Sequence, residues 1–498
     1  MPTILGSNSL DDSYQISNSL RFNDADNAHL EKTFSGSPTS TTKCTMSFWI
    51  KTGNLLSTSA RAIFSAIKSG SNEDVIKFGS SNGGNLGYLE FNFNNTNDGA
   101  MMPGNTTALI EFRDPAAWYN FVIAIDTTQG SAEDRLKFYV NGTLQEVEAS
   151  ISGGNLQADT EMAQNYDLGF LTASKHQIGM NVESSNSEPF DGYLSEFYFV
   201  DGQQYAPTVF AETDDNGVWI PKDAKDDISF GNYGFYMEFK QTGTSANSSG
   251  MGADTSGNDN HFSASGTATT DITTDTPTNN FCVMNPLIKS SLGSTNQPTY
   301  SEGNVRVDNH SSGDASTLST FGVANGKWYF EAKYSKSPSD AQGYPQLGWA
   351  KNGNHMDGEM VGFHTPSGSD YRAKNGGSTI SNAFDGVPAA NDIIGFYLDL
   401  DNSTLIVHRN GSDFMGSGAT NGIDFSSTTF DPDTGFFQVR YNSNTNVSHF
   451  IEFNFGQPSY SISSAVSDAN GHGSFEYNPT LSGTNYLALC TKNLGATG

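Results

Sequence analysis

Hydrophobic and polar residues alternate in short runs along most of this chain. The runs are rich in aromatic and β-branched residues at a period of two and are bounded by Gly, Asn, Asp or Ser; examples are residues 46–53, 88–94, 119–127, 193–202, 327–335, 393–402 and 449–456. Alternation of this kind is typical of half-buried antiparallel strands. Asn141-Gly142 and Asn410-Gly411 supply the residues that tight hairpin turns need at positive φ. The pattern predicts an all-β fold.

Composition and charge narrow the class of protein. The 498 residues allow about two to four domains, and 54 acidic against 25 basic residues give a net charge of −29. A chain this acidic repels nucleic acids and anionic lipid surfaces, so we predict no nucleic-acid partner. The sequence holds no run of about 18 apolar residues, so we also predict no membrane insertion. The carboxylates either solvate the surface or, in part, hold divalent cations.

The cysteines and the N-terminus bear on where the protein folds. Cys44, Cys282 and Cys490 are far apart and odd in number, which predicts buried free thiols rather than disulfides or a zinc site. The first residues, MPTILGSNSLDDSYQ, have neither the basic nor the apolar segment of a signal peptide. We therefore expect either assembly in a cytoplasm followed by release through lysis, or a cytoplasmic role.

Residues 15–205 carry a specific order of strand segments. They are TMSFWIKTG (45–53), WYNFVIAID (118–126), LKFYVNGTLQ (136–145), HQIGMN (176–181) and FDGYLSEFYFVDGQ (190–203). In this order they resemble the laminin G-like, concanavalin A-like jelly roll. The resemblance implies two facing antiparallel sheets with alternate aromatic side chains between them, namely Phe48, Phe121, Phe138, Phe197 and Phe199.

A later segment resembles the opening of the same family. Residues 234–266, GFYMEFKQ…ADTSGNDNHFSASG, have the strand and the D-x-S-G-N-x-N turn that precede the first strand in many relatives. Here the segment follows the last strand of the module. We therefore expect it to fold back as a permuted strand, which extends the first domain to about residue 268.

The resemblance also implies a calcium site at this turn. The candidate ligands are Asp254 and Asn258, and less strongly Asn260, because oxygen-rich turns suit a hard cation. A carboxylate of the last strand would complete the site; where the family has Asp this chain has Ser195, so Glu196 becomes the candidate. The alternative is an Asx-turn without a metal.

Residues 318–480 contain a second ordered set. GKWYFEAKY (326–334), PQLGWAKNG (345–353), a hairpin at 386–411 and IEFNFGQ (451–457) closely resemble a SPRY domain. The resemblance implies a sandwich whose loops at one end bind peptides or protein surfaces. The corresponding stretches are 352–358, 364–376 and 411–425, with His355, His364, Tyr371 and Arg372 as the larger candidate ligand-binding side chains. Alternatively, these loops are solvated or pack against a neighbouring subunit.

The remaining segments lack long alternating runs. Residues 206–317 are rich in Ser, Thr, Asn, Asp and Pro, and we interpret them as a loop-rich connector between the two sandwiches. Residues 1–14 are expected to form an N-terminal arm and residues 481–498 a C-terminal tail.

The sequence favours a binding or structural protein over an enzyme. It holds no metalloprotease, P-loop or dinucleotide-binding motif, and no Gly-x-Ser-x-Gly in a strand–helix context. Glycoside hydrolases need a pair of carboxylates; Glu90 is the nearest candidate, and its partner is missing. We predict that the protein is not an enzyme.

The combination of modules resembles structural proteins of marine bacteriophages. The segments that carry this resemblance are NSLRFNDADNAHL, FDGYLSEFYFVDGQ, ETDDNGVWIPK and DTSGNDNHF. It implies a homo-oligomeric virion protein, such as a tail fibre, head fibre or capsid decoration, exposed on the particle surface. Its partners would be other virion proteins and a host-surface glycan or protein. The alternatives are a purely architectural virion protein, a cellular lectin-like adhesin and a SPRY-type protein-binding adaptor.

Overall fold

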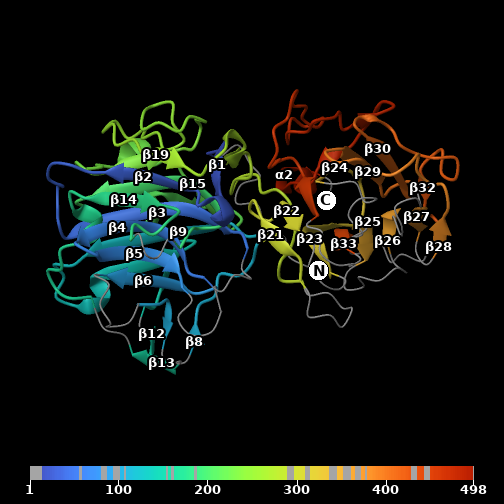
Figure 1. The fold of residues 1–498 in the computed structure, drawn as a ribbon. Helices are drawn as coiled ribbons and strands as arrows, with labels where there is room; N and C mark the ends of the chain where they lie inside the picture. Colours follow the sequence, from blue (N-terminus) through green and yellow to red (C-terminus); the bar gives the residue numbers. More distant parts are fainter. Residues whose placement is uncertain are drawn as a thin grey trace. The chain divides into compact units, whose positions relative to one another are not determined.

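The chain forms two compact units, Met1–Asn279 and Asn280–Gly498, each built around two large β-sheets (Figure 1). The computed structural model describes residues 14–54, 59–79, 87–93, 101–105, 108–147, 149–152, 155–158, 162–183, 188–288, 297–308, 315–335, 345–351, 360–364, 372–375, 378–427, 435–441 and 449–496. Almost all regular structure in these ranges is strand, so the all-β prediction is confirmed. The helical pieces are α2 (Thr491–Ala496) and the short 3-10 turns η1 (Asp24–Asp26), η2 (Ala132–Asp134), η3 (Gly169–Leu171), η4 (Pro207–Val209), η5 (Lys225–Asp227) and η6 (Thr269–Asp271).

Unit 1 is an antiparallel sandwich. One sheet has the order β11-β10-β9-β3-β15-β1-β20, and β18 also pairs with β15. Its strands are β11 (Thr143–Gln145), β10 (Leu136–Val140), β9 (Tyr119–Asp126), β3 (Lys43–Thr52), β15 (Gly192–Asp201), β1 (Ser19–Phe22), β20 (Ile272–Thr273) and β18 (Phe235–Met237). The other sheet, in its order, consists of β19 (Ser263–Ser265), β2 (His29–Thr33), β14 (Lys175–Ile178), β4 (Arg61–Ser69), β5 (Asn72–Phe78) and β6 (Leu89–Phe93).

The core of unit 1 is largely aromatic. Phe48 and Phe197 stack with ring centroids 4.9 Å apart, and Phe64 of the facing sheet meets Phe197 edge-on at 5.7 Å. The five phenylalanines expected between the sheets are all fully buried. Period-two alternation places such residues on one face of each strand, which explains why the sequence revealed them.

Residues 234–266 fold back onto unit 1, as the resemblance led us to expect. β18 pairs with β15 through Phe197↔Met237 and Phe199↔Phe235, and β19 pairs with β2. Phe235 and Phe262 lie in the core and meet edge-on, with centroids 4.9 Å apart. One short strand therefore joins each sheet of the sandwich.

A covering layer packs on the other face of the larger sheet; we call residues 14–16 and 205–230 the outer layer of unit 1. Phe210, Ala224 and Phe230 of this layer are buried against sheet residues that include Tyr198 and Val200. The layer contains the hairpin of β16 (Ala211–Thr213) and β17 (Trp219–Pro221). We expected residues 206–317 to form a connector between the two sandwiches. Instead, residues up to 279 belong to unit 1 and residues from 280 belong to unit 2.

Unit 2 is a second sandwich. Its larger sheet has the order β21-β22-β34-β24-β29-β30-β31, with β32 on β30 and β37 on β24. These are β21 (Thr299–Ser301), β22 (Arg306–Asp308), β34 (Phe450–Asn454), β24 (Lys327–Tyr334), β29 (Ile393–Asp399), β30 (Thr404–Arg409), β31 (Ser412–Asp413), β32 (Ile423–Asp424) and β37 (Leu487–Ala488). The facing sheet, in its order, consists of β23 (Ala315–Val323), β33 (Gly435–Tyr441), β25 (Pro345–Lys351), β26 (Met360–His364), β27 (Arg372–Asn375) and β28 (Ser378–Ile380).

Unit 2 also carries a covering layer, formed by Phe281 and residues 475–490, which we call the outer layer of unit 2. Phe330 and Phe396 stack inside the sandwich at 4.6 Å, whereas Tyr329 and Tyr397 point to the other face and pack with Phe475 and Tyr486 of the layer. β37 pairs with β24 in parallel. The segment expected to be a tail from residue 481 is therefore packed into unit 2 over its described length, up to residue 496.

Smaller hairpins and the turns complete the description. The hairpins join β7 (Gly104–Asn105) to β8 (Ala108–Leu109), β12 (Ala149–Ser152) to β13 (Asn155–Ala158), and β35 (Thr480–Leu481) to β36 (Thr484–Asn485). Both predicted Asn-Gly turns have positive φ at the two central residues. The three cysteines are free and buried, as predicted. No helix in the described part of the chain is long and apolar enough to cross a membrane.

Candidate functional site

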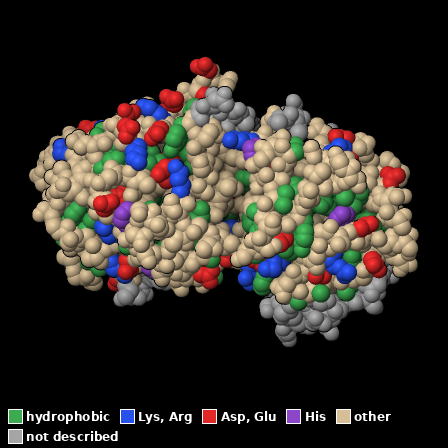
Figure 2. Space-filling view, turned by 90° about the horizontal axis from the view of Figure 1, so that it is seen from above, with side chains coloured by type: hydrophobic (Ala, Val, Ile, Leu, Met, Phe, Trp, Pro, Cys, Tyr) green, Lys and Arg blue, Asp and Glu red, His purple; other side chains and the backbone are tan. Residues whose placement is uncertain are grey.

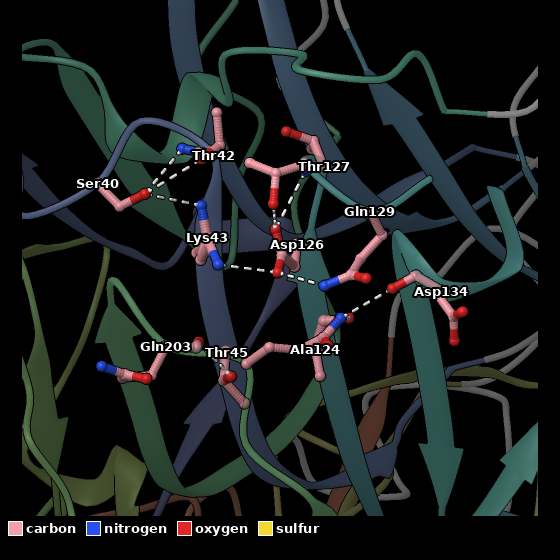
Figure 3. Close-up of polar contacts among 12 residues, drawn as sticks. Ser40, Thr42, Lys43, Thr45, Ala124, Asp126, Thr127, Gln129, Asp134 and Gln203 are labelled. Atoms are coloured by element: carbon pink, nitrogen blue, oxygen red, sulfur yellow. Dashed lines mark hydrogen bonds and ion pairs between the residues drawn. The ribbon is translucent and has the colours of Figure 1, made fainter. Parts of the chain in front are cut away.

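A polar surface lies where β3 begins and β9 ends (Figure 3). The register places Lys43 opposite Asp126, and Lys43 Nζ lies 3.0 Å from Asp126 Oδ2. Asp126 also accepts hydrogen bonds from Thr128 Oγ1 at 2.6 Å and Gln129 Nε2 at 2.8 Å. Burial alone would raise the pKa of Asp126, but these hydrogen bonds and the Lys43 ammonium outweigh it and lower the pKa to about 2. The carboxylate is therefore ionised and fixed in place.

The chain around this pair is held by further polar contacts. Ser40 Oγ accepts hydrogen bonds from the backbone N–H groups of Thr42 and Lys43, each at 3.1 Å. Thr45 Oγ1 donates to the Gln203 carbonyl at 2.8 Å, which fixes the chain where it leaves β15 (Figure 3). The Lys43 side chain is 39% exposed, whereas that of Asp126 is only 4% exposed. The surface thus presents an ammonium group on a rigid, hydrogen-bonded support.

No pattern in the sequence revealed this surface. Asp126 ends a predicted strand, Lys43 lies just before another, and 82 positions of chain lie between them. They meet because antiparallel pairing of β3 with β9 sets them in register. The alternating pattern predicts strands, but not which residues of two strands face each other.

Asp254, the first predicted calcium ligand, organises a turn. Its Oδ1 accepts hydrogen bonds from the backbone N–H of Tyr236 at 2.9 Å and of Ser256 at 2.8 Å. Its Oδ2 accepts hydrogen bonds from Ser256 Oγ at 3.0 Å and the Asn260 N–H at 2.8 Å. Asn258 and Asn260 each donate from their side-chain amide to the Gly234 carbonyl. These contacts are those of an Asx-turn fastened to the segment before β18.

Glu196, the other predicted ligand, lies in a separate cluster of tyrosines. It is 5% exposed, occupies a bulge of β15 with φ of 52°, and accepts hydrogen bonds from the hydroxyls of Tyr14, Tyr198 and Tyr236. Burial raises the pKa of Glu196 to about 7, although the tyrosine hydroxyls act in the opposite direction. Ser195 donates to the Asn18 carbonyl at 2.7 Å.

Asp254 and Glu196 do not share a site. The backbone N–H of Tyr236 bonds to Asp254 while its hydroxyl bonds to Glu196, so the length of the tyrosine separates the two carboxylates. Within the described ranges, no three His, Cys, Asp or Glu side chains cluster closely enough to hold a metal ion. Asp254, Asn258 and Glu196 therefore do not fit a common calcium site, and calcium binding stays a prediction.

Two of the four predicted ligand-binding residues of unit 2 lie within the described ranges, and both lie on strands. His355 and Tyr371 lie outside the described residues. His364 ends β26 and Arg372 begins β27, and the two are directly opposite in the antiparallel register. In the stretch 411–425, Phe414 and Ile423 are buried, so this part packs into the sandwich. The register brings two of the four candidates together at one end of the smaller sheet.

Charged side chains are interspersed among polar ones on the face seen in Figure 2. Ion pairs among the described residues of unit 1 include Lys137–Asp134 at 2.9 Å and Lys222–Asp227 at 3.4 Å. Exposed pairs of this kind contribute little to stability. They are consistent with a solvated acidic surface.

Comparison with known proteins finds a matching family model for part of the chain. Residues 24–209 match the family model described as the concanavalin A-like lectin/glucanases superfamily. No curated protein sequence matches the chain. The family description covers lectins and glucanases alike, so the match does not separate a binding protein from an enzyme.

Several solved structures are similar at low identity. The SPRY domain of human HERC1 is 16% identical, with a TM-score of 0.23, over 30% of this chain and 86% of that one. A heptameric SAP-like pentraxin from Limulus polyphemus is 17% identical, with a TM-score of 0.24, over 38% and 77%. A putative carbohydrate binding protein from Bacteroides ovatus is 16% identical, with a TM-score of 0.25, over 41% and 57%. At these values the likenesses carry no information about function. The family match, in contrast, identifies residues 24–209 as a laminin G-like domain of the concanavalin A-like kind.

Proposed function

We propose that this chain is a non-catalytic virion protein, such as a tail fibre, head fibre or capsid decoration. Its sandwiches would bind a host-surface glycan or protein, or neighbouring virion subunits, and the protein would be homo-oligomeric. The binding role is supported by the concanavalin A-like domain at residues 24–209 together with the exposed Lys43–Asp126 surface that this domain carries. The virion role rests on the resemblance of the whole chain's segments to phage structural proteins.

The Lys43–Asp126 surface is the best-defined candidate contact for a polar ligand in unit 1. Its ammonium group donates hydrogen bonds and is held by a buried carboxylate, so little side-chain freedom is lost on binding. The hydroxyl and amide groups of Ser40, Thr128 and Gln129 lie beside it. Such a mixture suits the hydroxyl groups of a glycan or the polar side chains of a protein loop.

A binding assay with matched lysine variants tests this proposal. The full chain is applied to a glycan array and to host cells, alongside Lys43→Ala and Lys222→Ala. Lys222 is the control because its side chain is 37% exposed and also pairs with a carboxylate, Asp227. We expect Lys43→Ala to lose binding at least tenfold and Lys222→Ala to bind as the wild type does. Equal binding by both variants would remove the Lys43–Asp126 surface from the proposal.

The virion role is tested separately. Proteomics of purified particles should find the chain, and electron microscopy should place it at the particle surface. Absence from particles would overturn the virion proposal and leave the cellular adhesin or SPRY-type adaptor. Presence in particles without glycan or cell binding would favour the purely architectural alternative. Release of sugar from any bound glycan would contradict the non-catalytic role.

A further inference from the structure

Another lysine–aspartate pair in unit 1 is completely enclosed. Lys51 lies in β3, and Asp275 follows β20 near the end of the unit. Lys51 Nζ lies 2.8 Å from Asp275 Oδ2, and the two side chains are 1% and 0% exposed. The two residues are 224 positions apart in the sequence. Folding therefore places a primary amine against a carboxyl group out of reach of bulk water.

Aromatic side chains and backbone contacts hold both groups. Trp118 Nε1 donates a hydrogen bond to Asp275 Oδ1 at 3.1 Å, and the Tyr193 ring centroid lies 5.5 Å from Lys51 Nζ. Trp118 and Tyr193 belong to a buried cluster with Ile16, Trp49 and Ala211. Ser19 Oγ also donates to the Asp275 carbonyl at 2.6 Å, which fixes the backbone that carries the carboxyl group.

We propose that Lys51 and Asp275 condense to form an intramolecular amide cross-link. The Lys51 nitrogen forms a bond to Asp275 Cγ, and the bond from Cγ to Oδ2 breaks. Two of the three ammonium protons leave with Oδ2 as one water molecule, and the third stays on the amide nitrogen. The reaction is neither an oxidation nor a reduction, and it needs no co-reactant.

The surroundings favour this reaction in three ways. The pair is shielded from bulk water, so no hydration shell separates the two groups, and transfer of one proton from the Lys51 ammonium to the Asp275 carboxylate gives the amine nucleophile. The fold holds the two groups in contact, which replaces a bimolecular step by an intramolecular one. The Trp118 N–H is placed on Oδ1, where negative charge develops when the nitrogen attacks. Trp118 is therefore assigned as the donor that stabilises the tetrahedral intermediate.

The Lys43–Asp126 pair provides an internal comparison on the same strand, β3. Its nitrogen–oxygen distance of 3.0 Å is similar, but its lysine side chain is 39% exposed. Its carboxylate also accepts hydrogen bonds from Thr128 and Gln129, which stabilise the ionised form. These donors and the Lys43 ammonium hold the pKa of Asp126 at about 2, so its carboxylate stays ionised. We therefore expect a cross-link at Lys51–Asp275 and none at Lys43–Asp126.

The cross-link would connect β3 to the last residues of unit 1. Asp275 is five positions before Asn280, where unit 2 begins. A pulling force that enters through unit 2 would then act on β3 through the amide and would not detach β18, β19 or residues 205–230 of the outer layer. Such a connection suits a protein exposed to mechanical load, although the inference does not depend on the proposed function.

Mass spectrometry of the full chain tests the inference. We expect an intact mass one water below the sequence mass, and a proteolytic product that joins the peptides of Lys51 and Asp275. Lys51→Arg keeps a cation beside Asp275 but lacks the nucleophilic amine, so it should have the full sequence mass. Trp118→Phe should form the link about 100-fold more slowly, the usual effect of losing one such donor.

Two results would overturn the inference. One is a wild-type chain that is folded by circular dichroism yet has the full sequence mass after prolonged incubation. The other is a loss of water that persists in Lys51→Arg or maps to another pair, including Lys43–Asp126. Because the primary readout is the wild-type protein, a variant that fails to fold leaves the test decisive.

Discussion

The outer layers of the two units are fastened in different ways. In unit 1, Glu196 meets only hydroxyl donors among the contacts described for it, from Tyr14, Tyr198 and Tyr236. In unit 2, the fully buried Glu331 accepts the backbone N–H groups of Glu476 at 3.1 Å and Tyr477 at 2.8 Å.

The difference shows two uses of a buried carboxylate. Glu331 also accepts hydrogen bonds from Asn454, Tyr329 and Tyr460, so it joins the outer layer of unit 2 directly to β24 and β34. Burial raises the pKa of both glutamates, to about 7 for Glu196, but only Glu331 has described hydrogen bonds from backbone N–H groups of its outer layer. We infer that the packing of unit 2 depends on the acceptor oxygens of Glu331, whereas unit 1 mainly loses stability when Glu196 ionises.

The largest expected effect is the loss of Glu331. Glu331→Ala leaves two backbone N–H groups, an amide and two hydroxyls without their acceptor, and should destabilise unit 2 by about 3–5 kcal/mol. Chemical denaturation followed by a probe in each unit measures the effect, with the unit 1 transition as the reference. Glu331→Gln keeps one acceptor oxygen and should therefore lose less stability than Glu331→Ala. A change below about 1 kcal/mol in the alanine variant would contradict the claim that unit 2 depends on Glu331.

The second largest expected effect is the pH dependence of the stability of unit 1. The folded-state pKa of Glu196, about 7, lies above its ordinary value of 4.5, so the folded state binds more protons between these values. The resulting stability is fully present below pH 4.5 and is lost as the pH rises through 7. Glu196→Gln removes this loss, so at pH 8 it should be more stable than the wild type by about 3 kcal/mol.

The control for this prediction is the same variant at pH 5. There the wild-type carboxyl is largely protonated, so the difference between the two proteins should shrink to about 1 kcal/mol or less. Thermal melting at the two pH values measures it. A stability difference that stays the same at both pH values would show that Glu196 does not titrate in the folded state.

A smaller effect is expected at the Asp254 turn. Asp254→Ala removes the acceptor of four hydrogen bonds and should lower the stability of unit 1 by about 1–3 kcal/mol. A melting temperature of the wild type that calcium leaves unchanged would indicate that the Asx-turn alone occupies this carboxylate. A rise with calcium that disappears in Asp254→Ala would instead establish the calcium site that the sequence resemblance implied.

The alternating pattern predicted the parts of the fold that depend on local periodicity. Long strands such as β3, β15, β24 and β29, and the two Asn-Gly hairpins, follow from residues close together in the sequence. The return of residues 234–266 was accessible only through the resemblance of its turn motif. Strands of two or three residues, such as β20 and β37, are too short to show any period.

The outer layers and the ion pairs could not be predicted in this way. Residues 206–230 look like a connector because their apolar residues, such as Phe210 and Phe230, are widely spaced among polar ones. Each covers a sheet face made by distant strands. The Lys51–Asp275 and Lys43–Asp126 pairs likewise depend on tertiary contacts between residues far apart in the chain. Such contacts leave no signal in a single sequence.

Hydrogen exchange of the full chain, followed by mass spectrometry, tests most directly whether the outer layers and returning strands are integral parts of the sandwiches. We predict that the backbone amides of β18 and β37 exchange as slowly as those of their partners β15 and β24, because they open only when their unit unfolds. Residues 206–230 should also be protected where Phe210 and Phe230 pack. Exchange of these segments within seconds, while β15 and β24 stay protected, would contradict the account and return them to the role of connector and tail.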